Sequence, residues 1–401
     1  MEEAGLVSIK KEFGDQAVER AIRAVERWQI ELPTWAFGSF GGGRFSGYIP
    51  PGAARTIEEK LDDIAFVHQL TGAVGGVSTH VLWDFSADGV QPEFALARKV
   101  AQAARKRGLK LGAVSPTFFL TGFHRGSFTA PREATRKQAI NQTILAGQVA
   151  AILGNQLVTL WFPDGSLYPG QVELSLAYER MREGLKACRE RLADSVTLLI
   201  EYKVFEPGTY STTIPDWGTA FALARSTGKK TGVLIDLGHH HPGTNIEQIV
   251  AILLAEGLPG GFHFNTRYAA DDDQAVEPEP QLARIFYELV RKRKRRFLPE
   301  NWSFMLDLAC SRENRVEAIL HSIDSLQITL ARACLVDEVR LFHFQQADDI
   351  IRANRFFDQA LVQADVRPIV RQARKNKGLP LDPVEAYRAS GYQKKIEAER
   401  R

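Results

Sequence analysis

The feature that most constrains the fold of this 401-residue chain is an alternation, repeated eight times, of short apolar runs and longer amphipathic segments. The runs are rich in Val, Leu, Ile and Phe, and several are apolar at nearly every residue, as is typical of strands covered on both faces. We predict strands at Thr34–Phe40, Val77–Asp84, Lys110–Phe118, Leu157–Phe162, Val196–Lys203, Gly232–His239, Gly261–Asn265 and Trp302–Cys310.

Amphipathic helical patterns separate these runs. In the first, Thr56–Leu70, Thr56 precedes Ile-Glu-Glu and is a plausible N-terminal cap. The pattern recurs at Pro92–Arg107, Arg132–Leu153, Gln171–Leu192, Asp216–Ser226, Asn245–Ala255, Gln281–Arg293 and Asn314–Val336. A βα unit repeated eight times without an obvious linker predicts an α/β protein with a closed (β/α)8 TIM barrel. The competing fold is an open doubly wound sheet, but Gly41-Gly42-Gly43 lacks the spacing and the following helix of its usual glycine-rich turn.

Additional helices are expected at both ends of the barrel. We predict an N-terminal helical segment over residues 1–31, the barrel over residues 32–344 and a C-terminal helical extension over residues 345–401. In the extension, Pro380 and Pro383 interrupt a series of polar helices.

Composition argues against some classes of partner. Lys and Arg total 51 against 48 acidic residues, and this formal charge of +3 gives no reason to expect nucleic acid or a membrane surface. Cys188, Cys310 and Cys334 are far apart and odd in number, which favours reduced thiols. The first 20 residues are highly charged, and no apolar run approaches the roughly 20 residues that span a bilayer. We therefore expect a cytoplasmic protein.

Four consecutive predicted strands each end in a metal-ligand residue type among apolar neighbours. These residues are Glu201, Asp236, His263 and Asp307. The active site of a (β/α)8 barrel forms at the C-terminal ends of its strands, and a carboxylate among apolar residues is costly unless a partner or cation neutralises it. Three oxygen ligands and one nitrogen suit a divalent ion of the Mn²⁺ or Mg²⁺ class. The pattern therefore predicts a metal site.

A second ligand set, His239, Asp271 and Asp273, lies just beyond the strand ends and would allow two metal ions to share the barrel mouth. Each residue alone has a simpler interpretation. A strand-end Asp can cap a helix, the Asp271–Asp273 run can be a solvated loop, and His239 can belong to a tight turn. The convergence of four strand ends is harder to explain by capping.

Aromatic residues mark the other side of the barrel mouth. His80, Trp83 and Trp161 stand at or just after the ends of the second and fourth predicted strands. They are equally consistent with ordinary core residues and with the apolar wall of a sugar site. On the fifth strand, period-two alternation points Lys203 the same way as Glu201, into the mouth.

Longer motifs resemble those of the L-rhamnose isomerases of the Pseudomonas type, distant relatives of xylose isomerase. The resemblance runs along most of the chain. It is carried by L-P-T-W at Leu32–Trp35, G-G-R-F at Gly42–Phe45, K-L-D-D at Lys60–Asp63, S-T-H-V-L-W-D at Ser78–Asp84, D-G-S-L-Y-P-G-Q at Asp164–Gln171, Y-S-T at Tyr210–Thr212, D-W-G-T at Asp216–Thr219, D-L-G-H-H at Asp236–His240, G-G-F-H-F-N at Gly260–Asn265, and Y-R-A-S-G-Y at Tyr387–Tyr392.

The resemblance implies a metal-dependent interconversion of L-rhamnose and L-rhamnulose, with other aldoses such as D-allose as further substrates. It implies two divalent ions per subunit, Mn²⁺ with Mg²⁺ or Co²⁺ as substitutes. One ion would be held by the four strand-end residues and the other by His239 and the two outer aspartates. Lys203, His80 and Asp307 become the expected catalytic residues, with Lys203 near the sugar O1 and His80 near the ring oxygen. We also consider that His80 acts together with Asp84 in ring opening.

The resemblance further implies that Trp83 and Trp161 line the sugar, and that Phe45 reaches into the site of a neighbouring subunit in a homotetramer. From the residues alone, Phe45 covers its own barrel or a partner's equally well, since its Gly-rich loop also exposes Tyr48 and Ile49.

This chain departs from the family pattern at two places near the predicted ligands. Residues 266–270 read T-R-Y-A-A where the family reads close to D-S-K-Y-G, and Asp307 is followed by Leu-Ala-Cys in place of Gln-Ser-His. All predicted ligands remain, so the changes concern the residues around them, which tune metal and sugar preference. The alternatives are a one-metal sugar epimerase of the same barrel superfamily, for which we find no clear second carboxylate base, a metal-dependent nuclease, which would need more histidine ligands and a basic face, and a non-catalytic metal- or sugar-binding barrel.

Overall fold

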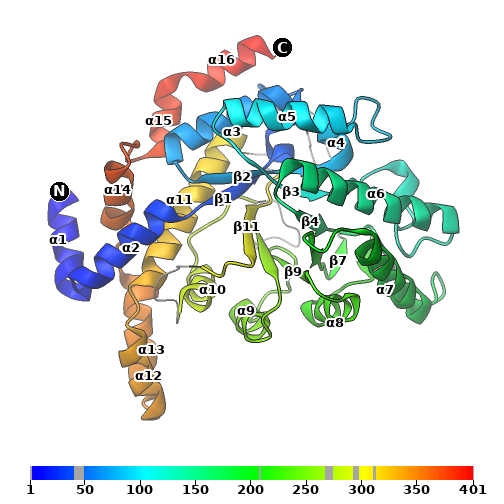
Figure 1. The fold of residues 1–401 in the computed structure, drawn as a ribbon. Coiled ribbons are helices and arrows are strands. Elements are labelled where there is room, and N and C mark those ends of the chain that lie inside the picture. The colour runs from blue at the N-terminus through cyan, green and yellow to red at the C-terminus, as the bar shows by residue number, and fades with distance from the viewer. Residues whose placement is uncertain are drawn as a thin grey trace.

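The computed structural model describes residues 2–39, 49–206, 209–266, 274–291, 298–309 and 313–400. In these residues eight parallel strands close into a barrel in the order β1-β11-β10-β9-β6-β4-β3-β2, with helices around it, which confirms the predicted fold (Figure 1). The barrel strands are β1 Ile30–Pro33, β2 Val74–His80, β3 Leu111–Ser115, β4 Leu157–Leu160, β6 Thr197–Glu201, β9 Thr231–Asp236, β10 Gly260–Phe264 and β11 Trp302–Leu306. Most of their residues are buried.

The eight crossover helices lie close to their predicted positions. They are α3 Ile57–Thr71, α5 Phe94–Lys106, α6 Glu133–Leu153, α7 Leu174–Arg191, α8 Trp217–Thr227, α9 Ile246–Ala255, α10 Pro280–Val290 and α11 Arg315–Cys334. The predicted cap of α3 is confirmed, because Thr56 accepts a hydrogen bond from the Glu59 backbone and Glu59 bonds back to the cap. Asp216, Asn245 and Asn314 cap α8, α9 and α11, and each side chain accepts a hydrogen bond from the backbone N–H three residues further on.

Several predicted strands extend beyond the observed ones, and two of them overlap helical segments. The first was predicted at Thr34–Phe40, whereas β1 ends at Pro33 and the 3-10 helix η1 covers Thr34–Phe37. The second was extended to Asp84, but β2 ends at His80 and the short helix α4, Val81–Phe85, follows. A continuous apolar run does not distinguish a strand from a buried helical turn. Here tertiary contacts decide, since Oδ2 of Asp84 accepts hydrogen bonds from the Thr34 hydroxyl at 2.7 Å and the His80 backbone at 2.9 Å.

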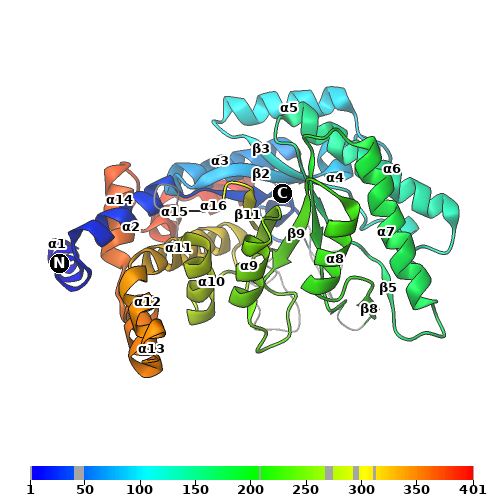
Figure 2. The same ribbon diagram turned by 60° about the horizontal axis from the view of Figure 1, so that its bottom comes forward.

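Further helices flank the barrel, as expected. They are α1 Glu2–Phe13 and α2 Asp15–Arg27 before it, and α12 Glu338–Gln346, α13 Ile350–Asp358, the π-helical turn η4 Gln359–Gln363, α14 Arg367–Asn376, α15 Pro383–Ser390 and α16 Tyr392–Glu399 after it. In both views α12 and α13 project from the body of the molecule (Figures 1 and 2). Because β1 begins at Ile30, the barrel starts before residue 32; the division into three separate segments stays a prediction.

Short elements near the barrel mouth complete the structure. The strands β5 Gly165–Ser166, β8 Tyr210–Thr212 and β7 Phe205–Glu206 form a small antiparallel sheet, and a 3-10 turn η3 covers Thr121–Phe123. In the part of the chain that the structure describes, no single helix is both long and apolar enough to cross a membrane; α11 and α12 meet that test only as a pair bent by 60°.

The C-terminal end is fastened to the barrel by a buried ion pair. Arg400 Nη1 and Nη2 lie 2.7 and 2.8 Å from the two carboxylate oxygens of Asp63 on α3, and both side chains are at most 5% exposed. The Tyr392 hydroxyl donates to the same carboxylate at 2.6 Å, and Arg400 also donates to the Gly52 carbonyl at 3.0 Å. The tail therefore holds α3 and the chain that leads into it.

We predict that Arg400→Gln lowers the free energy of unfolding by about 3–5 kcal/mol, because the Asp63 carboxylate is left buried without its cation. The matched control is Arg388→Gln. Arg388 pairs with Glu317 at 2.8 Å but is 56% exposed, and exposed pairs contribute only about 0–1 kcal/mol. Urea unfolding of both variants measures the difference, and equal losses would contradict the anchoring role.

Candidate active site

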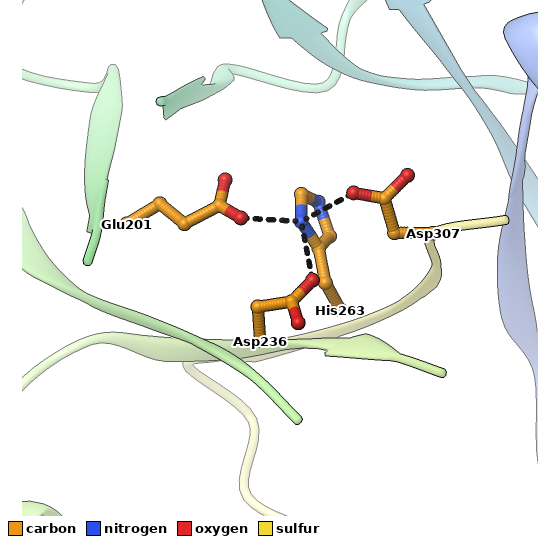
Figure 3. A group of neighbouring side chains, drawn as sticks. All are labelled: Glu201, Asp236, His263 and Asp307. Atoms are coloured by element: carbon orange, nitrogen blue, oxygen red, sulfur yellow. Dashed lines mark hydrogen bonds and ion pairs between the residues drawn. The ribbon is translucent and has the colours of Figure 1, made fainter. Parts of the chain in front are cut away.

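The four predicted strand-end residues converge in the barrel mouth. Glu201 and Asp236 are the last residues of β6 and β9, His263 lies in β10 and Asp307 directly follows β11. These strands are consecutive neighbours in the barrel, so their ends meet at one point. One possible ligand atom from each residue lies within 4.8 Å of all the others, and Figure 3 shows the three carboxylates directed at the imidazole. The group is a candidate metal-binding cluster of Glu, Asp and His.

The charges of the cluster favour an added cation. Nδ1 of His263 lies 3.3 Å from Glu201 Oε1, 3.3 Å from Asp307 Oδ2 and 3.8 Å from Asp236 Oδ2. Burial alone lowers the pKa of His263, but the three carboxylates outweigh burial and raise it to about 10. Three largely buried carboxylates around one nitrogen thus need positive charge, which a proton on His263 or a divalent cation can supply. The donor set fits an oxygen-preferring divalent metal.

His239, predicted for a second metal, lies next to the same cluster. Its Nδ1 is 2.9 Å from the Tyr202 carbonyl, which can only accept, so Nδ1 carries the hydrogen. In the neutral ring Nε2 then carries the lone pair, and it lies 3.9 Å from Asp236 Oδ1. This is the tautomer that a metal ligand needs. The other two predicted ligands, Asp271 and Asp273, lie outside the described residues.

Asn265 was missed by the sequence analysis as a site residue. Its Nδ2 lies 3.0 Å from each oxygen of Asp236, and its Oδ1 accepts a hydrogen bond from the Gly238 backbone at 2.8 Å. The Gly238 N–H also donates to Asp236 at 2.8 Å. Asn265 therefore orients Asp236 and the turn that carries His239. Period-two alternation from His263 places Asn265 on the same face, and this signal could have identified it.

An aromatic wall faces the cluster across the mouth. Trp83 and Trp161, both predicted, are joined by Phe119, which was not. The Phe119 ring stacks on Trp161 with centroids 4.5 Å apart and 4° between planes, and lies 5.5 Å from Trp83. Phe119 is 47% exposed, so the wall presents an apolar face to solvent. Phe119 directly follows the third predicted strand. It was missed because an apolar residue at a strand end does not stand out from the core residues around it. The other expected substrate contact, Phe45, lies outside the described residues.

His80 and Lys203 border this space. The His80 ring lies 4.3 Å from Trp83, and within the described residues its buried Nδ1 has no hydrogen-bond partner. Asp84 accepts hydrogen bonds from the His80 backbone at 2.9 Å and from the Lys60 side chain at 2.8 Å, so its bond to His80 is made through the main chain. Lys203 lines one small cavity together with Glu201 and Trp161, and its Nζ lies 3.3 Å from Glu206. The mouth thus combines a cationic side chain, an imidazole and an apolar wall.

Comparison with known proteins agrees with this architecture. A family model described as xylose isomerase-like TIM barrel matches residues 76–326. The chain is 36% identical over 389 residues to a "probable sugar isomerase" of Mesorhizobium japonicum, covering 95% of this chain and 88% of that protein. It is 24% identical over 361 residues to the L-rhamnose isomerase of Shigella flexneri, covering 83% of each. A solved L-ribulose 3-epimerase shares the fold, with a TM-score of 0.52, 11% identity and coverage of 76% of this chain and 95% of that one.

The protein is a (β/α)8 barrel with a candidate metal cluster at the C-terminal ends of its strands. This chain belongs to the xylose isomerase-like TIM barrel family. The chain is less similar to the L-rhamnose isomerase than to the probable sugar isomerase. The comparisons therefore support a sugar isomerase without specifying the sugar.

We predict that His80 makes the protein less stable in acid. Burial lowers the pKa of His80 from 6.5 to about 4, against the opposing effect of Asp84. Between pH 6.5 and 4 the unfolded chain therefore binds a proton that the folded protein does not, and the free energy of unfolding falls as the pH falls. The loss across this window is about 3 kcal/mol.

Urea unfolding of wild type and His80→Asn at several pH values measures this contribution. The free energy of unfolding of wild type, relative to that of His80→Asn, should fall by about 3 kcal/mol from pH 6.5 to 4. Above pH 6.5 the difference between the two proteins should not change with pH. Exposed His343 offers a control substitution of the same kind. A difference independent of pH would show that the buried His80 is not the source.

Proposed function

We propose that this protein is a metal-dependent aldose–ketose isomerase that interconverts L-rhamnose and L-rhamnulose and also acts on aldoses such as D-allose. The observation that carries the proposal is the convergence of Glu201, Asp236, His263 and Asp307 opposite an aromatic wall. The similarity to a probable sugar isomerase and to L-rhamnose isomerases supports the same reaction class.

The proposal includes the two-metal arrangement expected from the sequence. Glu201, Asp236, His263 and Asp307 would hold one divalent ion, and His239 with Asp271 and Asp273 a second, Mn²⁺ being the expected metal and Mg²⁺ or Co²⁺ its substitutes. The lone-pair nitrogen of His239 beside Asp236 supports the second position. When bound, such ions polarise the sugar oxygens at C1 and C2.

The chain's own residues account for orientation and proton control. Isomerisation moves one hydrogen from C2 to C1, while the C2 hydroxyl loses a proton and O1 gains one. Lys203 would stabilise negative charge developing at O1, and its Nζ lies 3.3 Å from Glu206 Oε2. The buried Nδ1 of His80 would bind the sugar's ring oxygen or its hydroxyl during ring opening. The aromatic wall would exclude water, so that the migrating hydrogen does not exchange.

The expected assembly is a homotetramer in which Phe45 of one subunit completes the site of another, in a cytoplasmic protein. The assembly is proposed because of the family resemblance, and the cytoplasmic location because of the cysteine pattern and the charged N-terminal residues. The alternatives are a one-metal epimerase and a non-catalytic metal- or sugar-binding barrel. An epimerase inverts one carbon and forms no ketose from an aldose, and a binding barrel forms no product.

We predict that the chelated protein binds Mn²⁺ and that Asp236→Asn weakens this binding by more than about 100-fold, beyond the roughly 10–100-fold effects of residues that only support a ligand. Calorimetric titration measures the affinity. Asp164→Asn is the matched control, because Asp164 is a buried carboxylate beside the mouth that accepts hydrogen bonds from Ser127 and Thr129 and is not in the ligand set. Comparable losses in the two variants would argue against the ligand assignment.

We predict that deuterium at C2 of L-rhamnose appears at C1 of L-rhamnulose formed in ordinary water, and that chelation abolishes ketose formation while Mn²⁺ restores it. Transfer within the substrate is expected because the structure offers metal ligands and an apolar wall rather than an assigned carbon base. Mass spectrometry or NMR of the product locates the label. Washout of the label would point to proton exchange through a side-chain base, and full activity in a metal-free sample would overturn the proposed function.

A further inference from the structure

The carboxylate of Asp307 has a partner that comes from the opposite end of the chain. The indole Nε1–H of Trp35 donates to Asp307 Oδ1 at 2.8 Å, across 272 positions of sequence. The second oxygen, Oδ2, faces His263 Nδ1 at 3.3 Å, inside the candidate metal cluster (Figure 3). The two oxygens of one carboxylate thus point to two different partners.

The fold explains how these residues meet. β1 and β11 are neighbours at the seam where the first and last barrel strands close the sheet, with Glu31 paired to Met305. Directly after β1 the chain turns into the 3-10 helix η1, which places Trp35 over the mouth beside the residue that follows β11. The hydrogen bond therefore crosses the closing seam of the barrel.

The Trp35 ring is held in place by its surroundings. It is 7% exposed and packs edge-on against His80, with ring centroids 5.0 Å apart and 74° between the planes. A buried, rigid donor of this kind has no freedom to follow a carboxylate that rotates. The carboxylate of Asp307 is instead held to one orientation, with Oδ2 turned toward the cluster.

We propose that Trp35 is a positioning residue for the metal site: its indole N–H occupies Asp307 Oδ1 and presents Oδ2 to the cation, while the edge of its ring supports His80 on the sugar side. This inference rests on the proposed function, because it needs the cluster to bind a divalent ion. A hydrogen bond from a fixed donor to a ligating carboxylate orients the ligand before the ion arrives, and such supporting residues alter affinity about 10–100-fold.

The test replaces the donor and keeps an aromatic ring. Trp35→Phe should weaken Mn²⁺ binding to the chelated protein by about 10–100-fold, measured by calorimetry. Trp302→Phe is the matched control: Trp302 is buried on β11, the strand that leads to Asp307, and among the described residues its Nε1 has no hydrogen-bond partner. Trp302→Phe removes the same atoms from the interior as Trp35→Phe but removes no hydrogen bond to Asp307. The Mn²⁺ affinity of this control variant should therefore stay at the wild-type value.

A second measurement separates positioning from a general loss of stability. Asp307→Ala should weaken Mn²⁺ binding, and adding Trp35→Phe to it should weaken binding no further if Trp35 acts through Asp307. Additive losses, or equal losses in Trp35→Phe and Trp302→Phe, overturn the inference. If Trp35→Phe keeps the wild-type Mn²⁺ affinity, the role of Trp35 is wrong but the proposed function is unaffected. If the wild-type protein binds no divalent ion, both the role of Trp35 and the proposed function are wrong.

Discussion

The site depends on the electrostatic balance of one imidazole among three carboxylates. Taking Glu201, Asp236 and Asp307 out of water is expensive, and each is tolerated only because a positive partner stands at their centre. The three carboxylates raise the pKa of His263, because the protonated imidazole supplies a positive charge among them. A divalent cation satisfies the same demand with the imidazole neutral, so ion binding exchanges a proton for a metal at the same point.

The barrel sets this balance by geometry. Parallel strands end on one face, and four neighbours in the order β6, β9, β10 and β11 each bring one ligand type to it. The opposite arc, from β2 to β4, brings the aromatic wall of Trp83, Phe119 and Trp161. Charge and apolar surface are therefore separated to the two sides of one mouth. A polyhydroxylated ring with one apolar face matches such a mouth better than a flat or uniformly charged ligand does.

Much of this could be predicted because it depends on local pattern. Period-two alternation and strand ends are visible in sequence, and they led to the four residues that the structure brings together as a candidate metal cluster, and to His239 beside them. The fold followed from eight repeats of the same unit. The first strand was misplaced because Thr34–Phe37 is apolar enough to be mistaken for a strand. Its helical turn is held by contacts with distant residues, among them the bonds of Thr34 to Asp84 and of Trp35 to Asp307. Asn265 was missed as a site residue although period-two alternation from His263 places it on the same face. The contact of Trp35 with Asp307 is a single hydrogen bond between residues far apart in sequence, which no local pattern encodes.

Asp307 is followed in sequence by apolar residues, so its contacts with residues of other elements matter for its orientation. Leu308 is buried, and the polar contacts of Asp307 include the side chains of Trp35 in η1 and His263 in β10, and a backbone hydrogen bond to the Phe264 carbonyl at 3.1 Å. In apolar surroundings each of these interactions is stronger than it would be beside water. Since the bond from Trp35 crosses the seam between β1 and β11, the proposed role of Trp35 would connect the candidate metal cluster with the closure of the barrel. If Asp307 binds a cation, linkage then requires that a change which loosens this seam also weakens the binding of the cation.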